Sequence, residues 1–299
     1  MISKDKGDKL VRIYFFICDK FEELKYYCER FSNNNQPELT DQEIMTIYLY
    51  VMHQQGHFKV KHIHRFASEY LTSWFPKLSS YQAFNNRLNR LNGAFCKLVE
   101  IILTDFRPED CCLDQSLLDS MPIITCSGKR TGKVATEITN KGYCSTKSMY
   151  YYGMKMHLLG FRRIGKLPHP EQILFTQASV SDTTVYKQAW SELDNRVFFG
   201  DKIYSDLDFN EEMLKKNYSE MLTPIKEVKG MTDQIKQRIK AADDLFSTAV
   251  SRIRQPIEAL FNWLIEKADI QKANKVRSTR GLLVHAFGRL AAAYITLAI

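Results

Sequence analysis

The sequence has no long hydrophobic run and no C-x-x-C pair, and both absences limit what the protein can be. Residues 1–9 lack the apolar core of a signal peptide, and the apolar run at 290–299 is too short to span a bilayer. The seven cysteines predict reduced thiols, most of them small buried hydrophobes, rather than a disulfide framework or a zinc site. We therefore expect a cytoplasmic protein with no membrane partner.

Acidic residues are almost missing from residues 127–166, which gives the positive charge of the chain a location. That stretch holds nine basic residues and one acid, Glu137, so its excess matches the formal net charge of +8 for the whole chain. A second basic stretch, 267–280, has Asp269 as its only acid. A polyanion, most simply nucleic acid, is the partner that this distribution predicts. The alternative is a solvated basic surface that binds nothing.

The first third of the chain has helical spacing of apolar residues. Residues 10–31 predict one helix, and the capping box Thr40-Asp-Gln-Glu43 predicts another that starts at Thr40. A further helix is expected over 79–91, with Arg87 and Arg90 on one face. A recognition helix that contacts DNA phosphates and an ordinary solvated helix fit this segment equally well. We expect residues 1–105 to form an all-helical N-terminal domain that binds DNA ends.

From residue 106 the pattern changes to short β-like runs. Strands are expected at 111–119, 150–159, 172–176, 197–199 and 221–225, and helices at 182–193, capped by Asp182, at 206–217, with Leu214 inward, and at 232–269. This order predicts an α/β fold: a ribonuclease-H-like mixed sheet with flanking helices over residues 106–299, with a helical insertion at about 227–250.

Three acidic residues fall where such a sheet would bring them together. The apolar run 197–199 delivers Asp201 to the carboxyl end of a central strand, the first strand carries Asp119, and Glu258 flanks the apolar face of the last helix. An Asp after a strand is also a common turn former, and Asp114 and Asp182 are alternatives for the two aspartates. Converging carboxylates repel one another unless a divalent cation binds between them, and two Mg²⁺ ions held in this way support phosphodiester displacement.

The chain resembles bacterial insertion-sequence transposases of the DDE class, and within them the branch conventionally numbered nine-eight-two. The matching blocks occur in the expected order and are Leu39-Thr-Asp-Gln-Glu-Ile44, Trp74-Phe-Pro76 through Leu91, Leu118-Asp-Ser-Met-Pro122, Lys141-Gly-Tyr-Cys144, Tyr151-Tyr-Gly-Met-Lys-Met-His157, Gly200-Asp-Lys-Ile-Tyr204, Leu222-Thr-Pro224 and Ile257-Glu-Ala-Leu-Phe261. The resemblance implies a ribonuclease-H-like catalytic domain in which Asp119, Asp201 and Glu258 form the catalytic triad that binds metal ions.

The resemblance also implies the reaction and its partners. The enzyme would bind the terminal inverted repeats of its element, hydrolyse phosphodiester bonds at the ends and join the 3′-hydroxyl to target DNA, using two Mg²⁺ ions for which Mn²⁺ substitutes. Double-stranded DNA would be its partner in the bacterial nucleoid, and synapsis of two ends implies a homodimer. A nuclease of the same fold without strand transfer and a catalytically silent DNA-binding regulator remain alternatives.

Several basic residues are expected along the DNA. They are Arg87 and Arg90 of the N-terminal helix, Lys129, Arg130 and Lys147 of the basic stretch, and Lys155, His157, Lys202 and Arg254 near the triad. For Lys155 and His157 the alternative is the outward polar face of a strand. The chain departs from related transposases at Ile203, where Gly is usual, at Ser251, where Tyr is usual, and at Lys267, which lies two places late.

Overall fold

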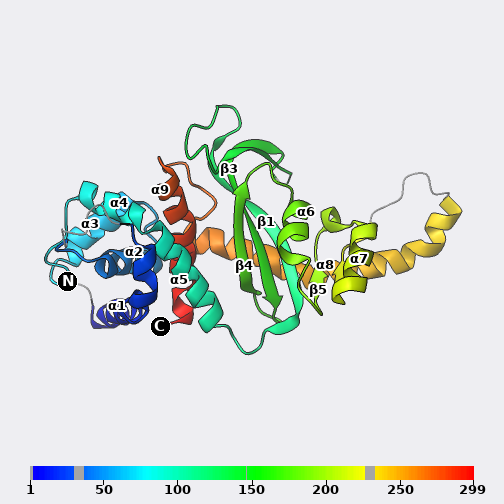
Figure 1. The fold of residues 1–299 in the computed structure, drawn as a ribbon, viewed down its shortest axis with the longest axis horizontal. Coiled ribbons are helices and arrows are strands. Elements are labelled where there is room, and N and C mark those ends of the chain that lie inside the picture. The colour runs from blue at the N-terminus through cyan, green and yellow to red at the C-terminus, as the bar shows by residue number, and fades with distance from the viewer. Residues whose placement is uncertain (1–2, 30–36, 146, 226–232) are drawn as a thin grey trace.

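The computed structural model describes residues 3–29, 37–145, 147–225 and 233–299, with the backbone alone for 233–238. Figure 1 shows a body of helices at one end, a sheet in the middle and the long helix α8 running past the sheet and projecting beyond it. Neither α8, which has 36 residues, nor any other helix in the described ranges has an apolar stretch that could cross a bilayer.

The helical body contains the five N-terminal α-helices. They are α1 Lys4–Leu24, α2 Asp41–Gln55, α3 Val60–Tyr70, α4 Tyr81–Arg90 and α5 Asn92–Asp105, with the 3₁₀ turn Lys25–Tyr27 after α1. The capping box is confirmed, because the Thr40 side chain accepts from the Glu43 N–H while Glu43 accepts from the Thr40 N–H. The helix expected at 10–31 instead begins at Lys4 and ends at Leu24, and residues 30–31 lie outside the described ranges. Helix α2 is the centre of the body, since every residue from 44 to 52 is buried.

The C-terminal helices complete this body. Helix α9 spans Thr279–Leu283, a π-helical turn spans Val284–Gly288, α10 spans Arg289–Tyr294 and a 3₁₀ turn spans Ile295–Leu297. Helix α10 packs against α2 and α5. A Cβ at Gly288 would lie 2.8 Å from the Tyr48 ring, so glycine permits this close approach. Residues on both sides of the boundary expected at 105 therefore contribute to one helical body.

The sheet is mixed, as the sequence predicted. Its strands are β1 Cys112–Ser127, β2 Asn140–Cys144, β3 Met149–Arg162, β4 His169–Gln177, β5 Val197–Phe199 and β6 Glu220–Leu222. The order is β2-β3-β1-β5-β6, with β4 paired to the second half of β3. Strands β1, β5 and β6 run parallel to one another, and β3 is antiparallel to β1.

Two strand predictions need correction. Strand β1 does not end at Asp119 but continues to Ser127, because its second half pairs with β3 as far as Tyr151. Strand β2 was not predicted, since Asn-Lys-Gly-Tyr-Cys has no apolar alternation and forms a strand only through its pairing with β3.

Helices cover both faces of the sheet. On one face, Leu117 and Met121 of β1 join a core with Ile257, Leu260 and Leu264 of α8, which spans Asp233–Ala268. On the other face, Leu118 of β1 joins a second core covered by α6 Asp182–Val185 and the π-helical turn Tyr186–Trp190. Side chains therefore alternate between two cores along β1.

Three smaller expectations on packing also change. Helix α7 spans Leu207–Asn217, but Leu214 is exposed and its neighbour Met213 is buried. The insertion expected at 227–250 coincides with α8 from residue 233 onward, and residues 226–232 lie outside the described ranges. None of the seven cysteines forms a disulfide, but none is fully buried either, although most were expected to be.

Candidate active site

Asp119 on β1 and Asp201, two residues after the end of β5, follow the same register of neighbouring parallel strands. Leu117 of β1 pairs with Phe199 of β5 in the parallel ladder, and each aspartate is two residues further along its strand direction. Because side chains two residues apart share a face, both carboxylates lie on the face of Leu117 and Phe199, which belong to the core under α8. Asp201 caps the 3₁₀ turn Lys202–Tyr204 and accepts from the Lys202 N–H at 2.7 Å. The prediction that Asp201 follows a buried strand beside that of Asp119 is confirmed.

Helix α8 carries Glu258, and Arg254 connects Glu258 to Asp119. The buried residues Ile257 and Leu260 hold α8 against the sheet, while the Glu258 carboxylate is exposed. Arg254, one turn earlier, donates from Nη1 to Asp119 Oδ2 at 2.9 Å and from Nη2 to Glu258 Oε1. The Arg254 side chain is 15% exposed, and its guanidinium contacts carboxylates on two elements.

The electrostatics of Asp119 are unusual for a carboxyl group with a cationic partner. Burial raises its pKa to about 6, and the nearby charges of Asp182 and Asp201 add to this, while the Ser120 N–H and Arg254 oppose it. Arg254 has a raised pKa: burial disfavours its charge, but the carboxylates of Asp119 and Glu258 more than compensate. The site therefore holds more negative charge than its one arginine balances.

Tyr204 is the last residue of the matching block Gly200–Tyr204, but the sequence predicted no role for it. Its side chain is buried, and burial together with the charges of Asp182, Asp119 and Asp201 holds the pKa of its hydroxyl well above the ordinary value. A neutral phenol thus lies among three carboxylates. A Cβ at Gly200 would lie 2.7 Å from this ring, so glycine before Asp201 lets the tyrosine pack under the site. The spacing of Tyr204 three residues after Asp201 was the only sign of this in the sequence.

Asp182 is not the helix cap that the sequence predicted. The cap is Ser181, whose Oγ accepts from the Thr184 N–H at 3.1 Å. Asp182 is the first helical residue, and its Oδ1 lies 3.2 Å from Lys155 Nζ and 3.3 Å from His157 Nδ1. Burial alone would raise the pKa of Asp182, but His157 and Lys155 more than offset it and the pKa is lowered.

This arrangement changes the expectations for Lys155 and His157. His157 is fully buried and its Nε2 contacts Thr176 Oγ1 at 2.8 Å, so its ring offers no surface to DNA. Lys155 is 15% exposed and donates to the Val180 carbonyl at 2.9 Å. The strand expected at 150–159 is present in β3, but the start of α6 covers the face of Lys155 and His157 that was expected to be outward.

The other basic residues expected along DNA differ in their exposure to solvent. Arg87 is largely buried, pairs with Asp41 at 2.5 Å and donates to the Leu39 carbonyl, so it holds α4 against the start of α2. Exposed side chains are those of Lys129 and Arg130 after β1, Lys147, which donates to Gln271, and Lys202 beside Asp201. Arg90 is partly buried near Arg280 and Arg87, and burial together with those charges lowers its pKa.

Asp114, the alternative to Asp119, is an exposed residue near the start of β1.

No preformed metal cage accompanies these carboxylates. Over residues 3–29, 37–145, 147–225 and 239–299, no three His, Cys, Asp or Glu side chains converge closely enough to hold a metal ion. The guanidinium of Arg254 lies where Asp119 and Glu258 approach each other.

Comparison with known proteins bears on the part of the chain that carries this site. No curated protein and no solved structure matches the chain. A family model described as the transposase DDE domain matches residues 111–295, from the residue before β1 into the last 3₁₀ turn. The match covers more than half of the chain and includes every strand of the sheet, α8 and the three acidic residues. Transposases of the DDE class generally depend on divalent metal ions and act on DNA. The chain therefore belongs to the transposase DDE domain family.

Proposed function

We propose that the protein is the transposase of a bacterial insertion sequence, in the branch numbered nine-eight-two. It binds the ends of its element, cleaves phosphodiester bonds there and joins the free 3′-hydroxyl to target DNA. The observation that carries this proposal is the position of Asp119 on β1 and of Asp201 just after the neighbouring parallel strand β5, with Glu258 linked to Asp119 through Arg254. A role in DNA binding alone would need no such arrangement of acids.

The donor set fits Mg²⁺ in its chemistry. Asp119, Asp201 and Glu258 offer hard carboxylate oxygens, and burial, with a smaller contribution from the charges of Asp182 and Asp201, raises the pKa of Asp119. In the absence of metal, Arg254 forms hydrogen bonds with two of the three carboxylates, those of Asp119 and Glu258. Binding of an ion there requires at least one of these two hydrogen bonds to break. Two divalent ions bound there would supply Lewis-acid activation of the attacking oxygen and stabilisation of the leaving oxygen.

The residues of the chain then have separate tasks. Asp119, Asp201 and Glu258 would hold the metal ions through their carboxylate oxygens. Arg254 lies one helical turn before Glu258, and once released from Asp119 or Glu258 it would be free to donate to a DNA phosphate. Lys202, exposed beside Asp201, contacts the adjacent DNA backbone, as do Lys129, Arg130 and Lys147 further along the sheet. Synapsis of two DNA ends implies a homodimer acting in the nucleoid.

Cleavage of a labelled duplex tests the proposal. The duplex carries the inverted repeat that flanks the gene, and it is incubated with Mg²⁺, with Mn²⁺ or with EDTA. We expect metal-dependent nicking at the repeat end that is lost in Asp201→Asn and kept in Asp208→Asn, a control that removes an exposed acid from the first turn of α7. A pre-cut 3′-hydroxyl end should also be joined to a second DNA.

The alternatives give different results in the same assay. Nicking without joining of the pre-cut end identifies a nuclease of this fold. Binding of the repeat with no cleavage under either metal identifies a DNA-binding regulator. Nicking that survives in Asp201→Asn places the catalytic acids elsewhere.

A further inference from the structure

A groove of about 760 Å³ lies between the start of α3 and the turn that follows α8. Its two sides come from distant parts of the chain, residues 56–62 on one side and residues 269–281 on the other, with Asn85 and Asn89 of α4 between them. Five exposed cations line it: Lys59, Lys61, Lys272, Lys275 and Arg277. Neither basic segment alone forms this groove, which explains why the sequence did not predict it.

The positive charge of the groove is not balanced by acids. In the described ranges none of the five cations forms an ion pair, and the only carboxylate on the groove wall, Asp269, lies 3.5 Å from the buried guanidinium of Arg289. The pKa of His62 is lowered by desolvation and then by the charges of Arg65, Lys59, His57 and Lys61. The groove thus has a strongly positive potential that favours an anionic ligand.

The groove wall is held rigidly against the sheet. The Ile124 N–H of β1 donates to the Gln271 carbonyl at 2.8 Å, and the Ala273 N–H donates to the Ile124 carbonyl at 2.8 Å. On the other side, Ser278 caps α9 by accepting from the Gly281 N–H at 3.1 Å. Lys272, Lys275 and Arg277 therefore stand on a turn fixed to both the sheet and the helical body, rather than on a free loop.

The same contacts set the distance from the groove to the acidic site, meaning Asp119, Asp201 and Glu258. Lys272 bridges to Ile124, five residues along β1 from Asp119. A strand rises roughly 3.3 Å per residue, so the groove begins about 17 Å from the Asp119 position. Each strand of B-DNA carries one phosphate per about 3.4 Å, so this distance corresponds to about five base pairs.

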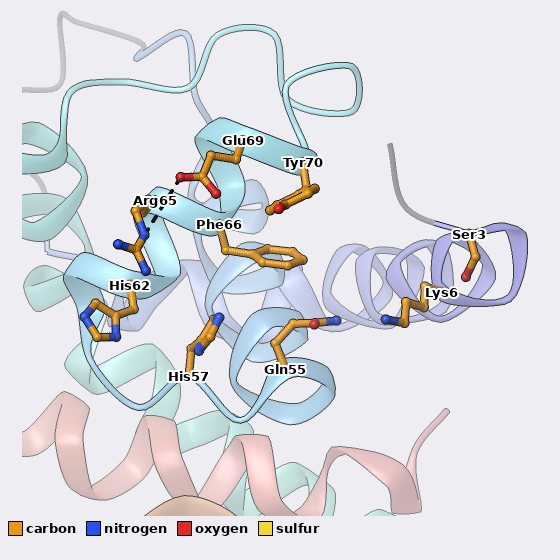
Figure 2. Close-up of a pocket in the computed structure, with 9 residues that line it drawn as sticks. All are labelled: Ser3, Lys6, Gln55, His57, His62, Arg65, Phe66, Glu69 and Tyr70. Carbon is orange, nitrogen blue, oxygen red and sulfur yellow. Dashed lines mark ion pairs between the residues drawn. The ribbon is translucent and has the colours of Figure 1, made fainter.

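A second hollow of about 480 Å³ adjoins the groove and shares His57 and His62 with it. Figure 2 shows the Phe66 ring pointing into this hollow between His57 and Tyr70. Arg65, the arginine that lines this hollow, has its Nε 3.9 Å from Glu69 Oε1, and Figure 2 marks this ion pair with a dashed line. The surplus of positive charge is therefore greater in the groove than in this neighbouring hollow.

We propose that the groove binds the phosphate backbone of duplex DNA, starting about five base pairs from the bond that the acidic site cuts. The inference rests on the proposed function, because it assumes that the end of the same duplex reaches Asp119 and Asp201. The two sides of the groove contact the backbone through Lys59 and Lys61 of the helical body and through Lys272, Lys275 and Arg277 of the turn. Contacts of this kind position DNA and carry no sequence information.

Binding of a 30-base-pair duplex to the full-length protein tests the groove. The variants are Lys59→Ala/Lys61→Ala and Lys275→Ala/Arg277→Ala, and the matched control is Lys215→Ala/Lys216→Ala, which removes two exposed cations from α7. We expect each groove variant to bind about tenfold more weakly, and the slope of log Kd against log salt to fall by about 2, since each lost phosphate contact removes about 0.9. The control should bind within about twofold of the wild type, and thermal unfolding should confirm that all three variants fold.

A series of duplexes shortened toward the cleaved end adds the position. Wild-type affinity should drop when the duplex is cut back to about five base pairs from the scissile bond, and the groove variants should show a smaller drop. Weaker binding of the groove variants supports the groove even if no cleavage is ever detected. Normal cleavage by the wild type, with groove variants that bind like the control, overturns the groove and leaves the proposed function standing. Tighter binding of duplex RNA than of duplex DNA also overturns it.

Discussion

Arg254 donates a hydrogen bond to Asp119 across 135 residues of sequence, from the middle of α8 to the middle of β1, at 2.9 Å. Its other Nη atom bonds Glu258 on its own helix. In the absence of metal, one guanidinium therefore neutralises part of the charge that a divalent ion would otherwise neutralise. In the proposed mechanism Arg254 would compete with metal ions for the same carboxylates, and its replacement should separate metal binding from cleavage.

Arg254→Ala should bind Mn²⁺ several-fold more tightly than the wild type in the absence of DNA. The reason is that no internal cation remains beside Asp119 and Glu258, which raises the negative potential of the site. The same variant should be about 2–4 kcal/mol less stable without metal, because a largely buried ion pair is broken and a carboxylate is left behind. Isothermal titration with Mn²⁺ and urea unfolding in EDTA measure the two effects. Equal Mn²⁺ affinity in the two proteins would contradict the competition.

Asp119→Asn should change how the stability of the metal-free protein depends on pH. The folded pKa of Asp119, about 6, lies above the unfolded value near 3.8, so the native state holds the proton that the unfolded state releases between these pH values. The free energy of unfolding of the wild type therefore falls as pH rises from about 4 to 6. Asparagine does not ionise, so the variant should gain roughly 1–2 kcal/mol relative to the wild type between pH 5 and pH 7.5. Urea unfolding in EDTA at both pH values measures this, and a difference that does not vary with pH would contradict it.

Lys155→Met should reduce stability and Lys202→Met should reduce DNA binding or cleavage, although both lysines were expected along DNA. Lys155 is bound to Asp182 and to the Val180 carbonyl, so its loss should cost about 3 kcal/mol of stability with little effect on DNA affinity. Lys202 is exposed, so its loss should change stability by under about 0.5 kcal/mol while lowering DNA affinity or cleavage. Thermal unfolding and anisotropy of a labelled duplex separate the two. A DNA-binding defect in Lys155→Met with normal stability would show that the lysine leaves Asp182 to contact DNA.

His285→Gln should weaken the acid sensitivity of the helical body. Burial and the neighbouring Arg289 lower the pKa of His285 to about 3, well below the unfolded value near 6.5. Only the unfolded state takes up the proton in this range, so stability present above pH 6.5 is lost as the pH falls toward 3. Glutamine keeps a donor for the Ile270 carbonyl, which His285 contacts at 2.7 Å, but does not titrate. Unfolding of the two proteins between pH 7 and pH 4 should give a shallower slope for the variant. Parallel slopes would assign the acid sensitivity to other groups.

Local signals in the sequence predicted the elements that local forces determine. The capping box at Thr40, the buried run before Asp201 and the apolar stripe around Ile257 each act within one or two turns of chain, and the structure confirms them. The neighbouring positions of Asp119 and Asp201 followed from the order of strands.

What could not be predicted depends on partners far away in sequence. The second half of β1 and the whole of β2 are strands because β3 lies beside them, which no local pattern indicates. The burial of His157 depends on where the first turn of α6 lies, and the engagement of Arg254 depends on where α8 crosses β1. The sequence identified the residue types of the site, while their contacts required the tertiary structure.

The return of the C-terminal helices into the helical body has a consequence for biosynthesis. Helix α10 buries Leu290 and Ala291 and packs on α2 and α5, so the N-terminal helices have an uncovered apolar surface until this last segment has been made. A nascent chain on the ribosome therefore acquires its complete helical body only after the sheet and α8 have emerged. The groove at α3 is therefore complete only after the sheet has been synthesised. A chain truncated after α8 would expose the surface that α10 normally covers.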